Sequence, residues 1–282
     1  MMSGATEEHA EMKGDSPPRQ RKAKRQGTRP VDILLTAVIP LAILLMIWQF
    51  IAYFAQGLGL LDIANSFVKL VIKGDADGTT LGQHTAMSMV RVTLGFALAA
   101  ATAIPLGIAV GRYRLVSMVL GPVVEAFRPL PPIAWIPLSI LLFRSNLIGA
   151  QVFIIWLGAF FPILINTTAG VKRTSTVHLD VASTFGTSER QILSKIVLPS
   201  AAPETFAGLR IGFGIGWMCL VAAEMFGSAI GLGYLVTITQ QTGKTGETIS
   251  AMIVIGFIGF LISYVFLRAE KRLLRWRREV AV

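Results

Sequence analysis

The stretch DVASTFGTSERQILSKIVLP, Asp180 to Pro199, decides the fold of this chain, because it is a polar, turn-containing segment between two apolar regions. Of the 282 residues, 53% are hydrophobic and 15% are charged, whereas a soluble domain carries about a quarter charged residues. The charges gather at both ends and in short islands between apolar runs. This distribution is typical of an all-α protein that crosses a membrane several times.

Six apolar runs are long enough to cross a bilayer, which takes about 20 residues. We expect spans at about 33–54, 90–110, 115–143, 147–168, 206–226 and 249–267. The third run is unusually long and contains Arg128-Pro129-Leu130-Pro131-Pro132. Because proline removes a backbone donor and bends a helix, the third span is expected to be broken.

Basic residues gather on one side of these spans. They occur in the first 30 residues, at Arg112 and Arg114, at Lys172 and Arg173, and in the run 268–278. The segments expected on the other side, about 55–85, 144–146 and 227–248, carry few basic residues, of which Arg144 fits least well. Cytoplasmic loops of membrane proteins are rich in Lys and Arg. We therefore expect both termini in the cytoplasm, with 1–30 as a disordered basic tail and 269–282 as a second basic tail. The net charge of +10 then needs no nucleic-acid partner, and the lipid bilayer is the expected partner.

Capping signals divide the Asp180–Pro199 region into two short helices. Thr176 is expected to cap the first helix, and Gly186 to supply the left-handed position that ends it. Ser188 and Gln191 have the spacing of a capping box at the start of the second helix.

The second helix is expected to be amphipathic and to end at Pro199. Ile192 and Ile196 recur at helical spacing, on the face opposite to Glu189 and Lys195. The sequence therefore predicts two short helices joined at Gly186 on the cytoplasmic side.

This loop resembles the cytoplasmic coupling loop of ABC-importer permeases. In that family the loop begins Glu-Ala-Ala, continues with three variable residues and Gly, and ends with an apolar residue, Leu and Pro. Here Asp180-Val181-Ala182 stands at the beginning, Gly186 at the required spacing, and Val197-Leu198-Pro199 at the end. Asp for Glu and Val for Ala are the two departures. The resemblance implies that an ATPase docks at Asp180, Val181, Ala182, Gly186, Ser188, Gln191, Ile192, Leu198 and Pro199.

Other segments between Leu81 and Trp276 resemble the permeases for nitrate, sulfonate and taurine. They are FRPLPP at 127–132, GAFFP at 158–162, GLRI at 208–211 and AAEM at 222–225, whereas FRSN at 143–146 departs from a glycine-containing stretch. The resemblance implies a MetI-like permease core over 81–268, with its coupling loop at 174–199. The first transmembrane helix and an outer loop would precede it over 31–80.

The function implied by this resemblance is that of the transmembrane permease subunit of an ATP-driven ABC importer. It would move a small oxyanion, such as nitrate, an alkanesulfonate or taurine, across the cytoplasmic (inner) membrane. The implied partners are a second copy of this chain, two cytoplasmic ABC ATPase subunits and an extracytoplasmic substrate-binding protein. No cofactor is expected in this chain, because ATP and Mg²⁺ would bind the partner ATPase.

The glycines of the fifth span favour helix packing over nucleotide binding. Gly208, Gly212 and Gly216 are spaced so that a second helix can approach closely. No GxxxxGK[ST] sequence occurs in the chain, so ATP hydrolysis is expected in a separate subunit.

Arg128, Pro131, Pro132 and Glu224 are the candidate residues of a translocation pathway. Broken membrane helices are tolerated where they line a cavity, so Arg128 could attract an anion there. The alternative is that Arg128 lies at the cytoplasmic interface and reaches lipid phosphates.

A carboxylate inside a span needs a partner or water. Because Glu224 would repel an anionic substrate, a structural partner, either Arg91 or Arg210, is the favoured interpretation.

Two other classes of protein remain as alternatives. A secondary carrier driven by an ion gradient would need paired intramembrane charges on inverted repeats, and few such charges are present. An intramembrane enzyme would need a nucleophile dyad or a metal cluster, whereas the three histidines are scattered and Cys219 is the single cysteine.

Overall fold

The computed structural model describes residues 39–40, 42–44, 46–50, 59–144 and 146–274. The chain divides into two compact units, Met1–Phe50 and Ile51–Val282. In the first unit the described residues are helical, whereas the expected basic tail at 1–30 and much of the predicted span 33–54 lie outside the described residues. The described part of the second unit is all-α, without strands, as the composition predicted.

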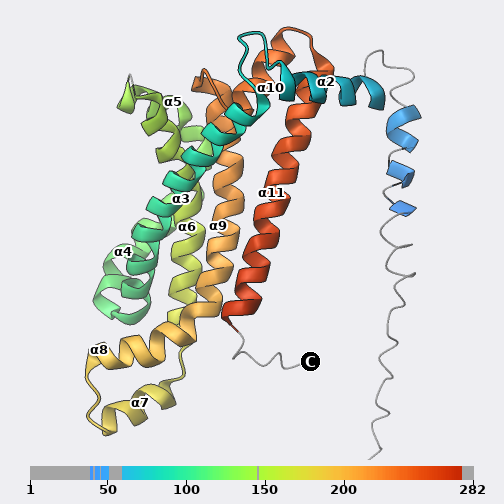
Figure 1. Cartoon of the computed structure of the whole chain (residues 1–282). Helices are drawn as coiled ribbons and strands as arrows, with labels where there is room; N and C mark the ends of the chain where they lie inside the picture. The colour runs from blue at the N-terminus through green and yellow to red at the C-terminus, as the bar shows by residue number, and fades with distance from the viewer. Residues whose placement is uncertain (1–38, 41, 45, 51–58, 145, 275–282) are drawn as a thin grey trace, which may run out of the picture. The chain divides into compact units, whose positions relative to one another are not determined.

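The helices of the second unit follow one another with short connections (Figure 1). Their bounds are α2 Leu60–Ile72, α3 Leu81–Arg112, α4 Arg114–Phe127, the 3-10 helix η1 Pro132–Trp135, α5 Ile136–Phe143, α6 Leu147–Lys172, α7 Thr176–Thr184, α8 Glu189–Ile192, the π-helical turn η2 Leu193–Val197, α9 Leu198–Gly227, α10 Leu232–Gln241 and α11 Thr245–Leu273.

Four helical segments in the described part of the chain are long and apolar enough to cross a membrane. They are α3, α6, the continuous segment Glu189–Gly227 that ends in α9, and α11. A fifth span is present if α4 is counted together with η1 and α5, which are bent by 84° at the Arg128–Pro131 break. The break lies where the prolines of the third apolar run predicted it.

α6 forms the centre of the bundle, between α3 and α9 (Figure 1). A Cβ atom on Gly208 would lie 2.7 Å from Asn166 Cβ, and one on Gly212 would lie 2.9 Å from the carbonyl oxygen of Ala159. Gly216 is less tightly packed, since its Cβ would lie 3.4 Å from Ile155 Cγ2. The small residues at 208 and 212 therefore allow α9 to approach α6 closely, as their spacing indicated.

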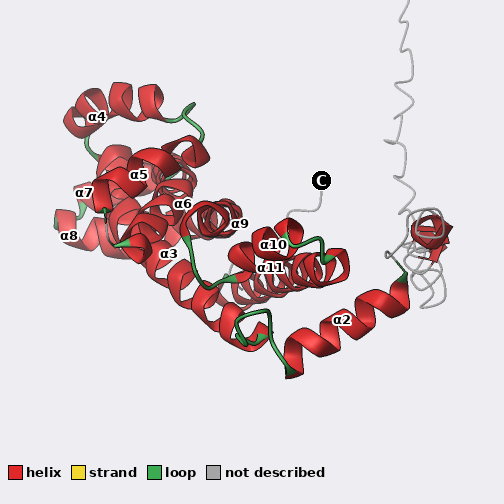
Figure 2. Cartoon of the chain, turned by 90° about the horizontal axis from the view of Figure 1, so that it is seen from above, coloured by secondary structure: helices red, strands yellow, loops and turns green. Residues whose placement is uncertain are grey.

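Two helices, α2 and α10, form the end of the bundle opposite to α7 and α8 (Figures 1 and 2). Both fall in segments that the sequence predicted to be outer loops. Leu70 of α2 and Leu232 and Leu235 of α10 are completely buried in one apolar cluster with residues of α3 and α9. These segments therefore contribute to the core, which their shortness and mixed polarity concealed.

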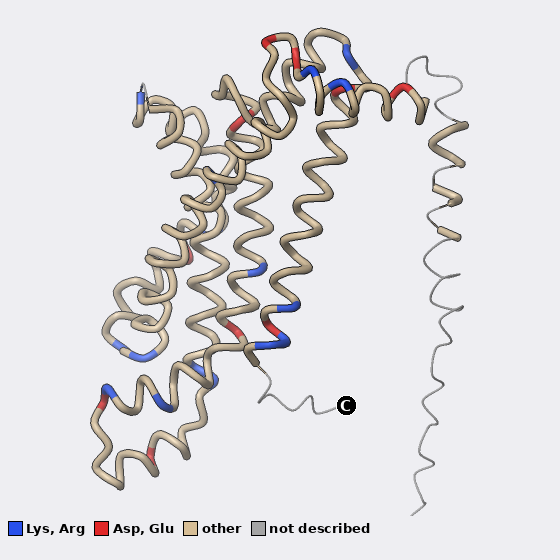
Figure 3. Tube along the Cα trace, viewed as in Figure 1, with Lys and Arg blue, Asp and Glu red and all other residues tan. Residues whose placement is uncertain are grey.

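Basic residues are more numerous at the end of the bundle that carries α7 and α8 than at the opposite end (Figure 3). Arg112 ends α3, Lys172 ends α6, and α11 carries Arg268, Lys271 and Arg272 near its end. α11 runs to Leu273, so the beginning of the expected tail 269–282 is helical and 275–282 lies outside the described residues.

Candidate functional site

The helix α7 ends in the turn that Gly186 predicted. Gly186 has a φ of +69°, a conformation that glycine adopts without a steric penalty. The Thr187 N–H donates to the carbonyl of Ala182 at 3.1 Å, and the Gly186 N–H donates to that of Ser183 at 3.0 Å. These two bonds satisfy carbonyls at the end of α7, so the turn has a defined direction.

The beginning of α7 differs from the prediction. Ser175 occupies the N-cap position, and Thr176 is the first helical residue. The Ser175 side chain forms no capping hydrogen bond, so α7 begins without the cap that the sequence suggested.

The capping box at the start of α8 is confirmed. Gln191 Oε1 accepts from the Ser188 N–H at 3.3 Å and from Ser188 Oγ at 3.1 Å. The Ser188 side chain in turn faces the backbone N–H of Gln191, so both halves of the capping box are present.

The prediction that Pro199 ends this helix is wrong. The helix continues from Glu189 to Gly227. Pro199 lies in the first turn of α9, directly after the π-helical turn Leu193–Val197. Proline is tolerated there because the π-helical turn directly before it changes the backbone pairing. The polar loop is therefore joined to a membrane span by uninterrupted helix.

The loop is attached to the bundle by an apolar cluster and an ion pair. Ile192 and Val197 are buried with Val171 of α6. The Arg112 guanidinium donates two hydrogen bonds to the Glu189 carboxylate, at 2.8 Å and 3.0 Å. The ends of α3 and α6 thus both hold the start of the Glu189–Gly227 helix.

The opposite side of the loop carries an exposed apolar stripe. Val177, Val181 and Phe185 follow one another at intervals of four residues and are 64%, 50% and 82% exposed. Side chains at this spacing lie on one face of a helix. Most of the residues predicted for ATPase docking are exposed, namely Asp180, Val181, Gly186, Ser188, Gln191, Leu198 and Pro199, whereas Ala182 is half-buried and Ile192 is buried.

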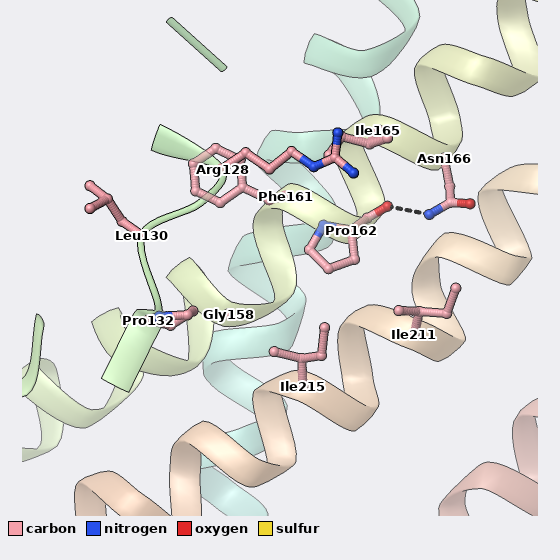
Figure 4. Close-up of a pocket in the computed structure, with 10 residues that line it drawn as sticks. All are labelled: Arg128, Leu130, Pro132, Gly158, Phe161, Pro162, Ile165, Asn166, Ile211 and Ile215. Carbon is pink, nitrogen blue, oxygen red and sulfur yellow. Dashed lines mark hydrogen bonds between the residues drawn. The ribbon is translucent and has the colours of Figure 1, made fainter. Parts of the chain in front are cut away.

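A second candidate site is a cavity of about 290 Å³ between the broken span, α6 and α9 (Figure 4). Arg128 is the single charged residue among those that line it. Pro132, Phe161 and Ile215 form apolar parts of the wall, and Asn166 donates to the carbonyl of Pro162 at 2.8 Å. Pro131 occupies the N-cap position of η1. The cavity can therefore offer a guanidinium to an anion in a largely apolar setting.

Glu224 is not part of this cavity. It is completely buried, and its Oε1 accepts from Arg91 Nη1 at 2.7 Å. Ser88 Oγ and the Gly233 N–H also donate to this carboxylate, at 2.8 Å and 2.9 Å. Arg91 is therefore the partner, whereas Arg210 forms a pair with Glu270 at 3.3 Å.

His84 extends this buried network in a way that the sequence did not indicate. Its Nδ1 accepts from the Gly231 N–H at 3.0 Å, so its Nε2 is the atom that donates to Asp75 Oδ2 at 3.2 Å. Arg91 also donates to the carbonyl of Ile230 at 2.6 Å. The turn between α9 and α10 is therefore tied to α3 at several points.

Tyr234 lies beside this network. Its ring stacks on that of His84, with centroids 6.2 Å apart. Burial, together with the carboxylates of Asp77 and Asp75, raises the pKa of Tyr234 above its ordinary value, so its hydroxyl stays neutral at physiological pH.

The arrangement of the helices matches that of known membrane permeases. A chain in an inward-facing structure of the MetNI methionine ABC transporter superposes with a TM-score of 0.53 at 21% identity, covering 68% of this chain and 92% of that one. A chain of an amino acid ABC transporter crystallised with histidines gives a TM-score of 0.55 at 14% identity, covering 79% and 99%. The described part of the chain therefore has the helical fold of these transporter chains, with several helices long enough to cross a membrane.

Sequence comparisons identify the family. Residues 103–279 match the family described as binding-protein-dependent transport system inner membrane component. A putative ABC transporter permease of Methanocaldococcus jannaschii is 39% identical, covering 88% of this chain and 93% of its own length. The taurine transport system permease TauC of Escherichia coli is 37% identical over 71% and 73%, and the putative aliphatic sulfonates permease SsuC of Bacillus subtilis is 31% identical over 95% and 97%. The chain belongs to this family and is the permease component of an ABC importer.

Proposed function

We propose that the 174–199 loop docks a cytoplasmic ABC ATPase and that ATP binding and hydrolysis there drive import through this chain. The complex would contain two copies of this permease, two ATPase subunits and a substrate-binding protein on the opposite side of the membrane. ATP and Mg²⁺ would be held by the ATPase alone. The name of the matched family, which refers to binding-protein-dependent transport, supports such partners.

The observation that carries this proposal is the helical continuity of the loop with a span. The stripe of Val177, Val181 and Phe185 offers an apolar surface for a partner. Beside it, the helix that starts at Glu189 continues to Gly227 without a break. A displacement of the loop would therefore tilt α9 directly, and α9 packs along α6 through Gly208 and Gly212.

The distribution of charge supports a cytoplasmic position for this loop. The end of the bundle that carries α7 and α8 also carries Arg112, Lys172 and the basic residues at the end of α11 (Figure 3). By the positive-inside rule this end faces the cytoplasm, and the network around Glu224 lies near the outer side.

The substrate proposed for the importer is a small oxyanion. Relatives at 31% to 37% identity are named as taurine, aliphatic sulfonate, nitrate and bicarbonate permeases, whose named substrates all carry an anionic oxygen group. The cavity lined by Arg128 has no carboxylate among its lining residues. A guanidinium forms paired hydrogen bonds with such anions, so this cavity suits a transient anion-binding site in the translocation pathway.

A pair of glycine substitutions tests the docking assignment. Gly186 and Gly243 have nearly the same φ, +69° and +70°, and a Cβ atom added at either position would meet nothing within 4 Å. Valine at either position would introduce a similar backbone strain of about 1–3 kcal/mol. Only Gly186 lies in the loop, since Gly243 lies between α10 and α11 at the opposite end.

We expect Gly186→Val to reduce co-purification of the ATPase at least tenfold while membrane insertion stays normal. Gly243→Val should retain the ATPase at the level of the unmodified protein. If Gly186→Val kept its ATPase and transported at the unmodified rate, the docking assignment would be wrong.

A further inference from the structure

The short helix α2 lies at the level where the spans end. It has 13 residues and is about 20 Å long, which is too short to cross the roughly 30 Å apolar layer of a bilayer. Its C-terminal end leads through residues 73–80 to the beginning of α3. Lys69 Nζ lies 2.7 Å from Glu247 Oε1, and Ser250 Oγ donates to the carbonyl of Ile63 at 3.2 Å, so α2 is fixed to the beginning of α11.

Packing among the residues that the structure describes covers only one edge of the apolar face of α2. Ile63 and Leu70 are buried, with 7% and 0% exposure. The other large apolar side chains of the helix are exposed: Leu60, Leu61, Phe67, Val68, Val71 and Ile72. At 100° per residue these six fall in one continuous arc about 140° wide.

Polar residues occupy the remaining side of α2. Asp62, Asn65, Ser66 and Lys69 lie together on a wheel of the helix, and Lys69 and Ser66 are the ones that lie next to the beginning of α11. The exposed apolar arc therefore points away from α11 and from the polar side. An arc of this size is costly in water, at about 25 cal/mol for each Å² of apolar surface.

We propose that α2 lies in the plane of the lipid–water interface, with this exposed arc inserted among the outer ends of the lipid chains. The helix lies at one edge of the bundle, beside the end of α11, and extends away from the other helices (Figures 1 and 2). Because α2 leads into α3 and packs on the beginning of α11, at the ends of two helices long and apolar enough to cross a membrane, lipid is the surface that the arc meets.

An apolar arc with a polar opposite side is the pattern by which helices bind membrane interfaces. In this position α2 also braces α11, because the contacts of Lys69 and Ser250 join the two helices. The bilayer surface would thereby fix the outer end of α11 during transport.

Spin-label accessibility tests the proposal. Cys219 is the single cysteine of the chain, so Cys219→Ala gives a background without thiols. Leu61→Cys, Val68→Cys and Ile72→Cys place a nitroxide on the arc, and Ala76→Cys places one on the exposed loop after α2 as the control. The full chain is reconstituted in vesicles of phosphatidylethanolamine and phosphatidylglycerol, and collisions with oxygen and with a water-soluble nickel chelate are compared.

We expect the ratio of oxygen to nickel collisions to be at least threefold higher at the three arc positions than at Ala76. Nickel collisions equal to those at Ala76 would show that the arc faces water. Low collisions with both reagents would show that protein covers the arc, either the first span or a second copy of this chain. Either of these results would overturn the proposal.

Discussion

Arg91 Nη1 lies 2.7 Å from Glu224 Oε1, and this buried pair joins α3 to the end of α9 that is farther from the coupling loop. Glu224 has 0% and Arg91 has 4% side-chain exposure, so neither charge is solvated. Removal of one partner would leave the other charge buried without compensation, which costs more than the pair itself contributes.

We therefore expect Arg91→Ala to destabilise the protein by about 3–5 kcal/mol. Arg210→Ala is the matched control, because Arg210 and Glu270 are 37% and 25% exposed. An exposed pair contributes about 1 kcal/mol or less, so this variant should unfold near the unmodified protein. Thermal unfolding in detergent measures both. A smaller loss in Arg91→Ala than in Arg210→Ala would contradict the structural role of the Arg91–Glu224 pair.

The contact between α6 and α9 can be tested at two neighbouring glycines. A Cβ on Gly212 would lie 2.9 Å from both the Ala159 carbonyl oxygen and Ile163 Cγ1, whereas one on Gly214 meets nothing within 4 Å. Gly212→Ala should cost about 1–3 kcal/mol by overpacking. Gly214→Ala should be neutral or stabilise the helix by up to about 1 kcal/mol. Equal unfolding temperatures of the two variants would refute this packing geometry.

A charge exchange tests how the coupling loop is held to α3. Arg112→Glu and Glu189→Arg each place like charges together where two hydrogen bonds now join the side chains. Because the pair is partly exposed, the effect on stability should stay below about 1 kcal/mol. Each single variant should lower transport per ATP hydrolysed, and the double exchange should restore most of it. If both single variants transported as much per ATP hydrolysed as the unmodified protein, this ion pair would not position the loop.

The role of Arg128 is tested by its charge. Arg128→Glu should reduce uptake of an oxyanion at least tenfold without loss of the assembled complex, since a carboxylate in an apolar cavity repels an anion. Arg128→Lys should keep part of the uptake, because the charge stays while the paired hydrogen bonds are lost. Arg114→Glu, at the other end of α4, serves as the control. Uptake assays in vesicles with the binding protein present distinguish these outcomes. Unchanged uptake in Arg128→Glu would exclude the cavity as a binding site for the transported anion.

Local patterns in the sequence predicted local structure well. Gly186 and the Ser188–Gln191 box were found from spacing alone, because caps involve residues three or four positions apart. The expectation that proline ends a helix was wrong at Pro199, because the π-helical turn before it changes the backbone hydrogen bonding. A sequence pattern carries no signal for such a turn.

Long-range contacts limited the rest of the prediction. Because a carboxylate inside a span needs a partner, the sequence indicates Arg91 or Arg210 as the partner of Glu224. Only the structure distinguishes between these two arginines. The three histidines have no metal-ligand spacing, and nothing in the sequence indicates that His84 accepts from the Gly231 N–H, 147 positions along the chain. The sequence did not predict α10 either. This helix has no side-chain cap at its beginning, and burial of Leu232 and Leu235 stabilises it.

Site-directed cross-linking at Phe185 tests the central claim, that the α7–α8 loop is the surface that meets the ATPase. Phe185 is 82% exposed at the end of the apolar stripe, and Thr242 is an exposed position at the opposite end of the bundle. In the Cys219→Ala background, Phe185→Cys and Thr242→Cys are treated in membranes with a short thiol-to-amine cross-linker. We predict an adduct of Phe185→Cys with an ABC ATPase subunit and none from Thr242→Cys. Absence of the Phe185→Cys adduct from complexes that still contain the ATPase, or equal adducts from both positions, would contradict this claim.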